Sequence, residues 1–534
     1  MNDLDDRSVD DGGSLFARFP AQNETDKSNP AIRLYGQRFY KDQTPVEYLA
    51  EFLLVFSSPK EKGGEYGNSF SISRDENKKA AYGYWPEDRV GLKLFSFFPS
   101  SKLETRHSVH RAAYLEALEE MKLALSGSSE QKEETIRFIQ SLLAGFVGVA
   151  KNRTWATHCF LPISRNLLGR ELDWLHSQAE KDANLTSWRD ASDYFARDRH
   201  NFMARGGELL FLQLANLFSS IDAPEILLFS RRDEYSHLEK KLQGLEQRLT
   251  AGLSTLLDQS LGPINSLVDM IESRLVDYKL ESQAKYAPLG WVPVASRIEA
   301  LLFASEIDNI CSLTVGALEK IDLLQLLCCM QVLRSLCFQA RRFDDSERST
   351  FGFVGNYAWV VSDPDAKSRE PIRKLAESSF TMIEALLYRV LRRPEINSDG
   401  NEKFAEADKH GFQIFRKISK EINLVIPPNG RGQRFSLNPA LMRFLVAALV
   451  QPGEYLRLTD FYHRVFAHYG IALGGEPLAV ALAWCGSGGD SKNYAVDMTS
   501  GWVEETLQQG GFLIELSDAV SIVHNPGSSS REWS

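Results

Sequence analysis

The densest group of side chains that could do chemistry lies between residues 197 and 208. A Gly-Gly pair there directly precedes an apolar helical run, and the backbone N–H groups at the start of a helix attract anions. Neighbouring arginine and histidine side chains could complete such a site. The stretch lacks the Gly-Lys-Ser/Thr of a phosphate-binding loop, so we do not predict a loop of that kind. The candidate residues for an anion or nucleic-acid site are Arg199, His200, Arg205, Gly206, Gly207 and Glu208.

Two interpretations of this 199–208 cluster stay open. In the first, it is the site of an unrecognised enzyme, which requires the side chains of Arg199, His200, Arg205 and Glu208 to converge in a concave pocket. In the second, it is a tight turn between helices, and its charges pair with one another. The direction in which the side chains point distinguishes the two.

A second basic group flanks residues 427–430, whose Pro-Pro-Asn-Gly sequence predicts a domain boundary. Because DNA binding draws most of its affinity from neutralised phosphates, we expect any contact with DNA to occur at this group. We call it the basic hinge. Its members are Arg416, Lys417, Lys420, Arg431 and Arg434.

Other combinations of residues support no specific chemistry. His107 and His110 have the spacing of two metal ligands on one helix face, but no third ligand lies close by in the sequence. Asp88 with Glu120 and Lys122 matches a nuclease triple by residue type only, since the last two fall on a predicted helix. Aromatic residues interleaved with arginines between 153 and 194 suit stacking against single-stranded nucleic acid, but we favour a helical core. We therefore predict no catalytic residue, no metal and no cofactor.

The composition indicates a globular protein from the reduced interior of a cell. Of 534 residues, 43% are hydrophobic and 11% aromatic, and the net charge of −10 argues against general affinity for nucleic acid or anionic membranes. The N-terminus lacks an apolar signal segment, and no run approaches the ~20 apolar residues of a membrane span. The six cysteines form no Cys-x-x-Cys pair, and three of them lie in one apolar helical run as buried thiols. We expect a cytoplasmic protein with no membrane segment.

The apolar periodicity predicts a multi-domain, mainly α protein with a small α+β region near its N-terminus. Residues 32–40 alternate like a strand, and leucines at three- and four-residue steps predict one long helix with a heptad-like seam over residues 231–257. The expected order is a disordered tail at 1–30, the α+β region at 31–125, a helical body at 126–426, a linker at 427–435, a winged-helix-like domain at 436–526 and a tail at 527–534.

The winged-helix prediction comes from an order of helix, helix, helix and hairpin within residues 436–526. Pro439 lies near the start of the first helix, and Gly470 ends the second. Residues 512–516 and 519–523 alternate as a β-hairpin, which would be the wing.

The charge of this module is unusual for a protein that reads DNA. In DNA-reading winged helices, the helix before the wing presents basic or amide side chains to the major groove. Here that helix carries Glu504 and Glu505 and no Lys or Arg, and residues 436–526 hold four basic and nine acidic residues. The sequence therefore favours protein docking by this module.

Three stretches of the chain carry a resemblance when they are taken together. They read Ile-Arg-Leu-Tyr-Gly-Gln-Arg-Phe at 32–39, Arg-His-Asn-Phe-Met-Ala-Arg-Gly-Gly-Glu at 199–208 and Arg-Val-Phe-Ala-His-Tyr-Gly-Ile at 464–471. As a set they resemble large, uncharacterised bacterial proteins from genome-defence gene neighbourhoods (anti-phage or restriction). The resemblance implies a partner such as an ATPase, helicase or nuclease subunit encoded elsewhere. It carries no catalytic residue over to this chain.

Three functional hypotheses follow from these observations. The leading one is a non-enzymatic adaptor or scaffold subunit of a multi-protein bacterial anti-phage or restriction complex. The second is a nucleic-acid-binding component of such a system, which would bind DNA through the basic hinge in a salt-sensitive way. The third is an unrecognised enzyme that acts at the 199–208 cluster.

Overall fold

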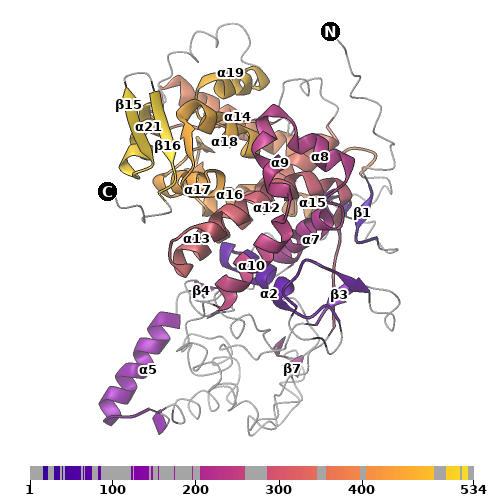
Figure 1. The fold of residues 1–534 in the computed structure, drawn as a ribbon, viewed down its shortest axis with the longest axis vertical. Coiled ribbons are helices and arrows are strands. Elements are labelled where there is room, and N and C mark those ends of the chain that lie inside the picture. The colour runs from indigo at the N-terminus through magenta and orange to yellow at the C-terminus, as the bar shows by residue number, and fades with distance from the viewer. Residues whose placement is uncertain are drawn as a thin grey trace. The chain divides into compact units, whose positions relative to one another are not determined.

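The fold was derived from a computed structural model, and the chain it describes is mostly helical (Figure 1). This confirms the expectation of a mainly α protein. The strands in the described part are two to five residues long and pair into small sheets. The described residues are 16–21, 29–36, 39, 43–61, 64, 67–74, 82–85, 119, 122–123, 125–143, 146–147, 154–155, 173–174, 195–196, 205–258, 286–344, 357–396, 404–485, 501–517 and 520–526.

The chain divides into two compact units, each built from separate stretches of sequence. Unit 1 comprises Met1–Lys41, Leu212–Gly252 and Gly290–Ser534. Unit 2 comprises Asp42–Phe211 and Leu253–Leu289. The contiguous domain boundaries expected from the sequence remain predictions.

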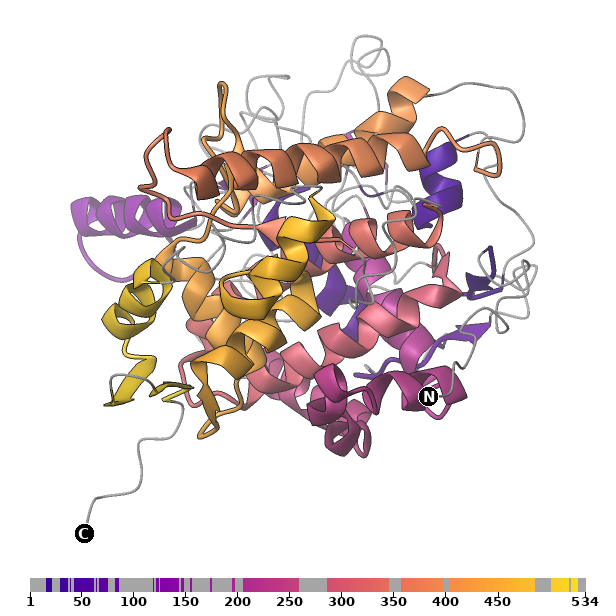
Figure 2. The ribbon, with the colours of Figure 1, turned by 90° about the horizontal axis from the view of Figure 1, so that it is seen from above.

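Unit 1 is built around helices α12 (Arg297–Ser312) and α13 (Ala317–Arg342), which pack against each other. Most side chains of α13 are buried, including Cys328, Cys329 and Cys337, because this helix is apolar around most of its circumference. Three further helices pack against this pair: α14 (Pro371–Val390), α16 (Phe412–Glu421) and α17 (Pro439–Leu449). Figure 2 shows this unit from above.

In the described part of the chain, α13 alone has the length and apolar composition that a membrane-spanning helix would need. Nearly all of its apolar stretch is buried inside the structure. The core helix of a globular unit has the same properties.

The C-terminal part of unit 1 combines helices with a three-stranded antiparallel sheet. After α17 follow β13 (Tyr455–Arg457), α18 (Leu458–Tyr469), α19 (Gly475–Trp484) and α21 (Gly501–Gln509), then β15 (Leu513–Ser517) and β16 (Val520–His524). The strand order is β13-β16-β15, and the β15–β16 hairpin lies at one edge of the unit (Figures 1 and 2). The hairpin confirms the two strands expected at 512–516 and 519–523. Gly470, with φ of 71°, ends α18 as predicted.

Shorter elements complete unit 1. The strand pairs are β1 (Arg18–Phe19) with β9 (Val292–Pro293), β10 (Trp359–Val360) with β14 (Ile471–Ala472), and β11 (Val425–Ile426) with β12 (Arg434–Phe435). The short helices are α1 (Pro30–Tyr35), α8 (Pro224–Ser230), α9 (Ser236–Leu242) and α15 (Phe404–Lys409), with 3-10 turns at Asp233–Tyr235 and Val294–Ser296. The turn of the β11–β12 hairpin contains the Pro-Pro-Asn-Gly sequence that we predicted as a linker.

Unit 2 is organised around α2 (Pro45–Ser57), which begins with a complete capping box. The Thr44 hydroxyl accepts the Glu47 N–H, and the Glu47 carboxylate accepts the Thr44 N–H at 2.9 Å. The first residues of α7 (Gly206–Phe218) pack against α2. The remaining elements are the sheet β2 (Ser73–Arg74), β3 (Tyr82–Tyr84) and β8 (Ala287–Pro288), the pairs β4 (Phe146–Val147) with β5 (Thr154–Trp155) and β6 (Asp173–Trp174) with β7 (Phe195–Ala196), and helix α5 (Ser129–Leu143).

One prediction near the N-terminus was wrong. Residues 32–35 of the expected strand at 32–40 lie instead in helix α1, because Asn29 caps its first turn by accepting the Ala31 N–H at 2.9 Å and Pro30 occupies the first helical position. Within the tail expected to be disordered, Arg18–Phe19 forms strand β1 and pairs with β9. The Arg18 guanidinium also lies 4.3 Å from the centre of the Trp291 ring.

The prediction of one continuous helix over residues 231–257 was also wrong. The helix is interrupted near Gly244, whose φ of 68° lies in the left-handed region. Helix α9 therefore ends at Leu242, and a separate helix, α10 (Leu245–Asp258), follows it. The leucine pattern nevertheless marked buried positions correctly, since Leu238, Leu245 and Leu249 are almost fully covered.

The contact between α2 and α7 predicts a steric requirement for glycine at position 207. A Cβ added there would collide with the Tyr48 carbonyl oxygen and the Phe52 backbone nitrogen. We expect Gly207→Ala to destabilise the protein by roughly 1–3 kcal/mol, the usual cost of overpacking. Gly316→Ala is the matched control, because nothing lies within 4 Å of the added Cβ. Urea unfolding of both variants checks this, and equal midpoints would contradict it.

Candidate functional site

The described members of the 199–208 cluster surround a carboxylate that belongs to the chain itself. The backbone N–H groups of Arg205 and Gly207 donate to the two carboxylate oxygens of Glu51, each at 2.7 Å. The Gly206 N–H donates to Gln43 Oε1 at 3.0 Å. The N–H groups that were expected to hold an external anion are therefore engaged within unit 2. Arg199 and His200 lie outside the described residues.

The electrostatics of this cluster follow from burial. Burial, together with the nearby Glu208 carboxyl, raises the pKa of Glu51 to about 8. The hydrogen bonds that Glu51 accepts from Gln43, Gly207 and Arg205 act in the opposite direction and are outweighed. Arg205 Nη1 lies 3.7 Å from Glu208 Oε1, and this carboxylate raises the pKa of Arg205. Arg205 also donates to the Pro288 carbonyl at 3.2 Å. In the described part, the arrangement corresponds to the turn with internally paired charges.

The basic hinge does not form one continuous cationic surface. Arg434 is buried and donates to the Ser362 hydroxyl at 3.0 Å and to the Pro364 carbonyl at 2.8 Å. Arg416 forms a two-bond ion pair with Glu384, at 2.5 and 2.8 Å. Of the remaining members, Lys417 and Lys420 are half-buried on α16 and Arg431 is exposed.

The other combinations of residues noted in the sequence fall largely outside the described part. This applies to Asp88, His107, His110 and Glu120, and to most of residues 153–194. Lys122 is described and pairs with Glu119 at 2.9 Å and with Glu133 at 3.3 Å. Among the described residues, no group of three His, Cys, Asp or Glu side chains could hold a metal ion.

A buried polar network that sequence reasoning missed lies at the centre of unit 1. Arg334 of α13 and Glu306 of α12 are both fully buried and form a bidentate pair, with Nη1–Oε1 at 2.8 Å and Nη2–Oε2 at 2.9 Å. Gln331 Oε1 accepts from Arg334 Nε at 2.8 Å. His468 of α18 adds its Nδ1 at 2.7 Å from Glu306 Oε1. No local pattern could have revealed it, because its members come from three separate helices.

The network extends to a second histidine, His237, which contacts His468. Burial lowers the pKa of His468 although Glu306 opposes this, so the ring is neutral at pH 7. We therefore assign the proton to Nδ1, which donates to Glu306, and this leaves Nε2 to accept from His237 Nε2 at 3.0 Å. Burial, and next His468, lowers the pKa of His237 to about 2, so this ring is neutral too. His237 Nδ1 then carries a lone pair, with no hydrogen-bond partner in the described chain.

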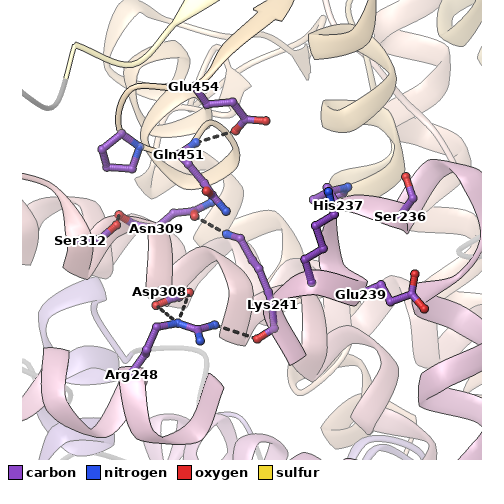
Figure 3. A pocket seen from close by; sticks show the side chains of 12 residues that line it. Ser236, His237, Glu239, Lys241, Arg248, Asp308, Asn309, Ser312, Gln451 and Glu454 are labelled. Carbon is purple, nitrogen blue, oxygen red and sulfur yellow. Dashed lines mark hydrogen bonds and ion pairs between the residues drawn. The ribbon is translucent and has the colours of Figure 1, made fainter. Parts of the chain in front are cut away.

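His237 lines a cavity of about 950 Å³ that lies within unit 1 (Figure 3). Helices α9, α10 and α12 and the turn before β13 supply the walls. Lys241 points into the cavity, and its Nζ donates to Asn309 Oδ1 at 2.5 Å. Burial lowers the pKa of Lys241 to about 8. The cavity thus brings a buried ammonium and a histidine acceptor to one concave surface.

A second feature of unit 1 is an apolar face on the β13-β16-β15 sheet. The register pairs Tyr455 with His524 and Ile514 with Ile522, which directs Tyr455, Ile514 and Val520 to the same side of the sheet. Leu516 is exposed beside them at a bulge in β15. These four are half of the eight large hydrophobic side chains that are exposed in the described part. The opposite side of the sheet is covered, as Leu513 and Val523 are buried.

No family model, curated protein or solved structure matches this chain. The resemblance to genome-defence proteins therefore stays an expectation.

The buried pair predicts that neutralising Glu306 is costly. Glu306→Gln leaves the Arg334 guanidinium buried without a counter-charge, and we expect a loss of roughly 3–5 kcal/mol in the free energy of unfolding. The control is Glu384→Gln, whose partner Arg416 has 44% of its side chain exposed, with an expected loss of about 0–1 kcal/mol. Urea unfolding followed by tryptophan fluorescence measures both. Similar small losses would show that the buried pair has no special weight.

Lys241 predicts a stability difference that depends on pH. Its folded pKa of about 8 lies below the ordinary 10.5, so below pH 8 the fold carries the full cost of a buried ammonium, and this cost disappears as the pH rises to 10.5. We expect Lys241→Met to be more stable than the wild type at pH 7 by roughly 2 kcal/mol, after subtraction of the lost hydrogen bond to Asn309. Unfolding curves at pH 7 and 10 test this. A difference that is the same at both pH values contradicts it.

Proposed function

We propose that this protein is a non-enzymatic adaptor or scaffold subunit, and that its C-terminal segment 436–526 is a winged-helix-like module that docks another protein. The observation that carries the proposal is the exposed apolar face on the β13-β16-β15 sheet. Contiguous apolar patches of this kind mark interaction sites when they occur on a folded surface.

The order of elements supports the winged-helix assignment. Helices α17, α18, α19 and α21 precede the β15–β16 hairpin, which takes the position of the wing. Strand β13, between the first two of these helices, pairs with β16 and joins the hairpin to the helical part of the module. The face in question is therefore the outer surface of the wing sheet.

The charge distribution favours a protein over a DNA duplex as the partner. Helix α21 carries Glu504 and Glu505 and no basic residue, whereas groove reading needs donors that also neutralise phosphate. On the sheet face, Arg457 lies opposite Ile522, is exposed, and has no carboxylate partner among the described residues. The partner surface that complements this face is apolar and carries a carboxylate opposite Arg457.

The resemblance to genome-defence proteins extends the proposal to a biological setting. We place the adaptor in a bacterial anti-phage or restriction complex, beside an ATPase, helicase or nuclease subunit. Of the two alternatives, nucleic-acid binding through the basic hinge gains no support from Arg416 and Arg434, since both are engaged within the protein. An enzyme at the 199–208 cluster gains none from Arg205, Gly206 and Gly207, which hold the carboxylate of Glu51 or the Gln43 side chain.

A pull-down from the native host tests the adaptor proposal. We expect the tagged protein to recover a defined partner with and without nuclease treatment, and the double variant Leu516→Glu, Val520→Glu to lose about tenfold or more of it. Leu228→Glu is the control, because Leu228 is equally exposed on α8, away from the sheet.

Three outcomes would overturn the proposal. Recovery that disappears after nuclease treatment would mean that nucleic acid bridges the complex. Equal loss of partner in the sheet variant and in the Leu228 control would mean that the sheet face is not the docking surface. Cleavage or modification of nucleic acid by the purified protein alone would rule out a purely non-enzymatic role.

A further inference from the structure

The cavity in unit 1 has an unbalanced charge once its ion pairs are counted. Each carboxylate in its lining already has an arginine partner: Glu239 with Arg231 at 3.1 Å, Asp308 with Arg248 at 3.1 Å and Glu454 with Arg464 at 2.9 Å. The two lysines in the lining, Lys240 and Lys241, have no carboxylate within ion-pair distance in the described chain. The cavity therefore holds two ammonium groups that form no ion pair in the described chain, although Asp308 and Glu454 attract Lys241 from beyond ion-pair distance.

Lys241 is the more informative of the two lysines. Only 8% of the residue is exposed, although a buried ammonium without a counter-charge is unfavourable. An ammonium has three N–H donors, and the only side-chain bond of Lys241 in the described part goes to Asn309. Two donors are left over, and Figure 3 shows the side chain reaching into the cavity between α9 and α12. The geometry provides a buried cation with spare donors and an open volume in front of it.

The other walls restrict what can fill this volume. A cavity of about 950 Å³ lies at the upper end of the range of pockets for small molecules. Arg248 donates to both oxygens of Asp308, at 3.1 and 3.2 Å, so its charge is already paired and its position is fixed. Lys240 and Lys241 together disfavour a cationic ligand.

His237 adds an acceptor whose orientation is fixed. Its Nε2 is bound to His468, which the Glu306–Arg334 pair holds in turn, so the ring cannot rotate without breaking the chain of hydrogen bonds. Its Nδ1 is free to accept a hydrogen bond from a hydroxyl or amine that enters the cavity. A recognition group that is positioned in advance in this way loses little entropy on binding.

We propose that this cavity binds a small organic anion. Its carboxylate or phosphate group pairs with Lys241 and Lys240, and a hydroxyl or amine elsewhere on the molecule donates to His237. This activity is additional to the docking role of the sheet face and does not depend on it.

Calorimetric titration of the full-length protein tests this at pH 7, where Lys241 is charged. The probes are glycerol 3-phosphate for the phosphate class, malate for the carboxylate class, and uncharged glycerol. We expect saturable binding of at least one of the two anions and none of glycerol. Lys241→Met should weaken the binding by about tenfold or more, since it removes a buried charge partner.

Two controls separate loss of the site from loss of the fold. Lys374→Met removes an exposed lysine of α14 outside the cavity and should leave the affinity unchanged. The unfolding midpoint of Lys241→Met should be equal to or above that of the wild type.

His237→Leu should weaken the binding of hydroxyl-bearing probes while the Lys241 ammonium stays in place.

The binding measurements show whether the cavity is an anion site. Binding that depends on Lys241 but not on Lys374 supports the site, and the preferred probe identifies phosphate or carboxylate as its ligand class. Absence of saturable binding by both anions, or equal binding by wild type and Lys241→Met, overturns it. Neither result changes the expected outcome of the pull-down, so the two proposals fail separately.

Discussion

The packing of unit 1 depends on one buried ion pair. Taking the Arg334 guanidinium and the Glu306 carboxylate out of water carries a large desolvation cost, and their attraction offsets it only when the geometry is good and the remaining hydrogen-bonding groups are satisfied. Both conditions hold: the pair is bidentate, Gln331 accepts a third guanidinium proton, and His468 occupies a carboxylate oxygen. Burial would raise the pKa of Glu306, but Arg334 and His468 hold it below its ordinary value.

The same constraint positions the elements that carry both proposed sites. The network joins α12, α13 and α18 directly and reaches α9 through His237. Gln331 also donates to Gln213 at 2.7 Å, which adds a residue of α7 that belongs to unit 1. Because α9 and α12 form walls of the cavity, and α18 follows β13 of the sheet, a change in this network would shift both surfaces. A polar network of this kind rigidifies a core when every member is satisfied.

The turn at residues 451–454 connects the two surfaces even more closely. Gln451 and Glu454 line the cavity, and the next residue, Tyr455, opens β13 and lies on the exposed sheet face. Arg464 of α18 fixes Glu454 through two contacts, at 2.9 and 3.0 Å. One part of the cavity wall and the first residue of β13 on the sheet face therefore belong to one short, well-anchored segment.

Local signals in the sequence predicted local structure well. Pro439, Gly470 and the alternation at 512–523 identified the C-terminal elements, because caps and turns depend on neighbouring residues. The same reasoning failed at 32–40, where the Asn29-Pro30 helix start outweighed an alternating pattern. It could not find the partnership of His237 and His468, since these are 231 residues apart and each looks ordinary alone. Arg434 looked like a surface cation for the same reason: its partners Ser362 and Pro364 are about 70 residues away, and no short pattern connects them.

The junction of α2 and α7 has a consequence for how this chain can vary during evolution. The side chains of Tyr48 and Gln43 lie where a side chain at Gly206 would be, and the backbone of α2 lies where one at Gly207 would be, while Glu51 accepts the N–H groups of Arg205 and Gly207. A larger residue at either glycine collides with α2 or with Gln43, and a shorter residue at position 51 leaves two backbone N–H groups without their acceptor. An inherited substitution at either glycine therefore requires α2, more than 150 residues away in the sequence, to move or to change with it.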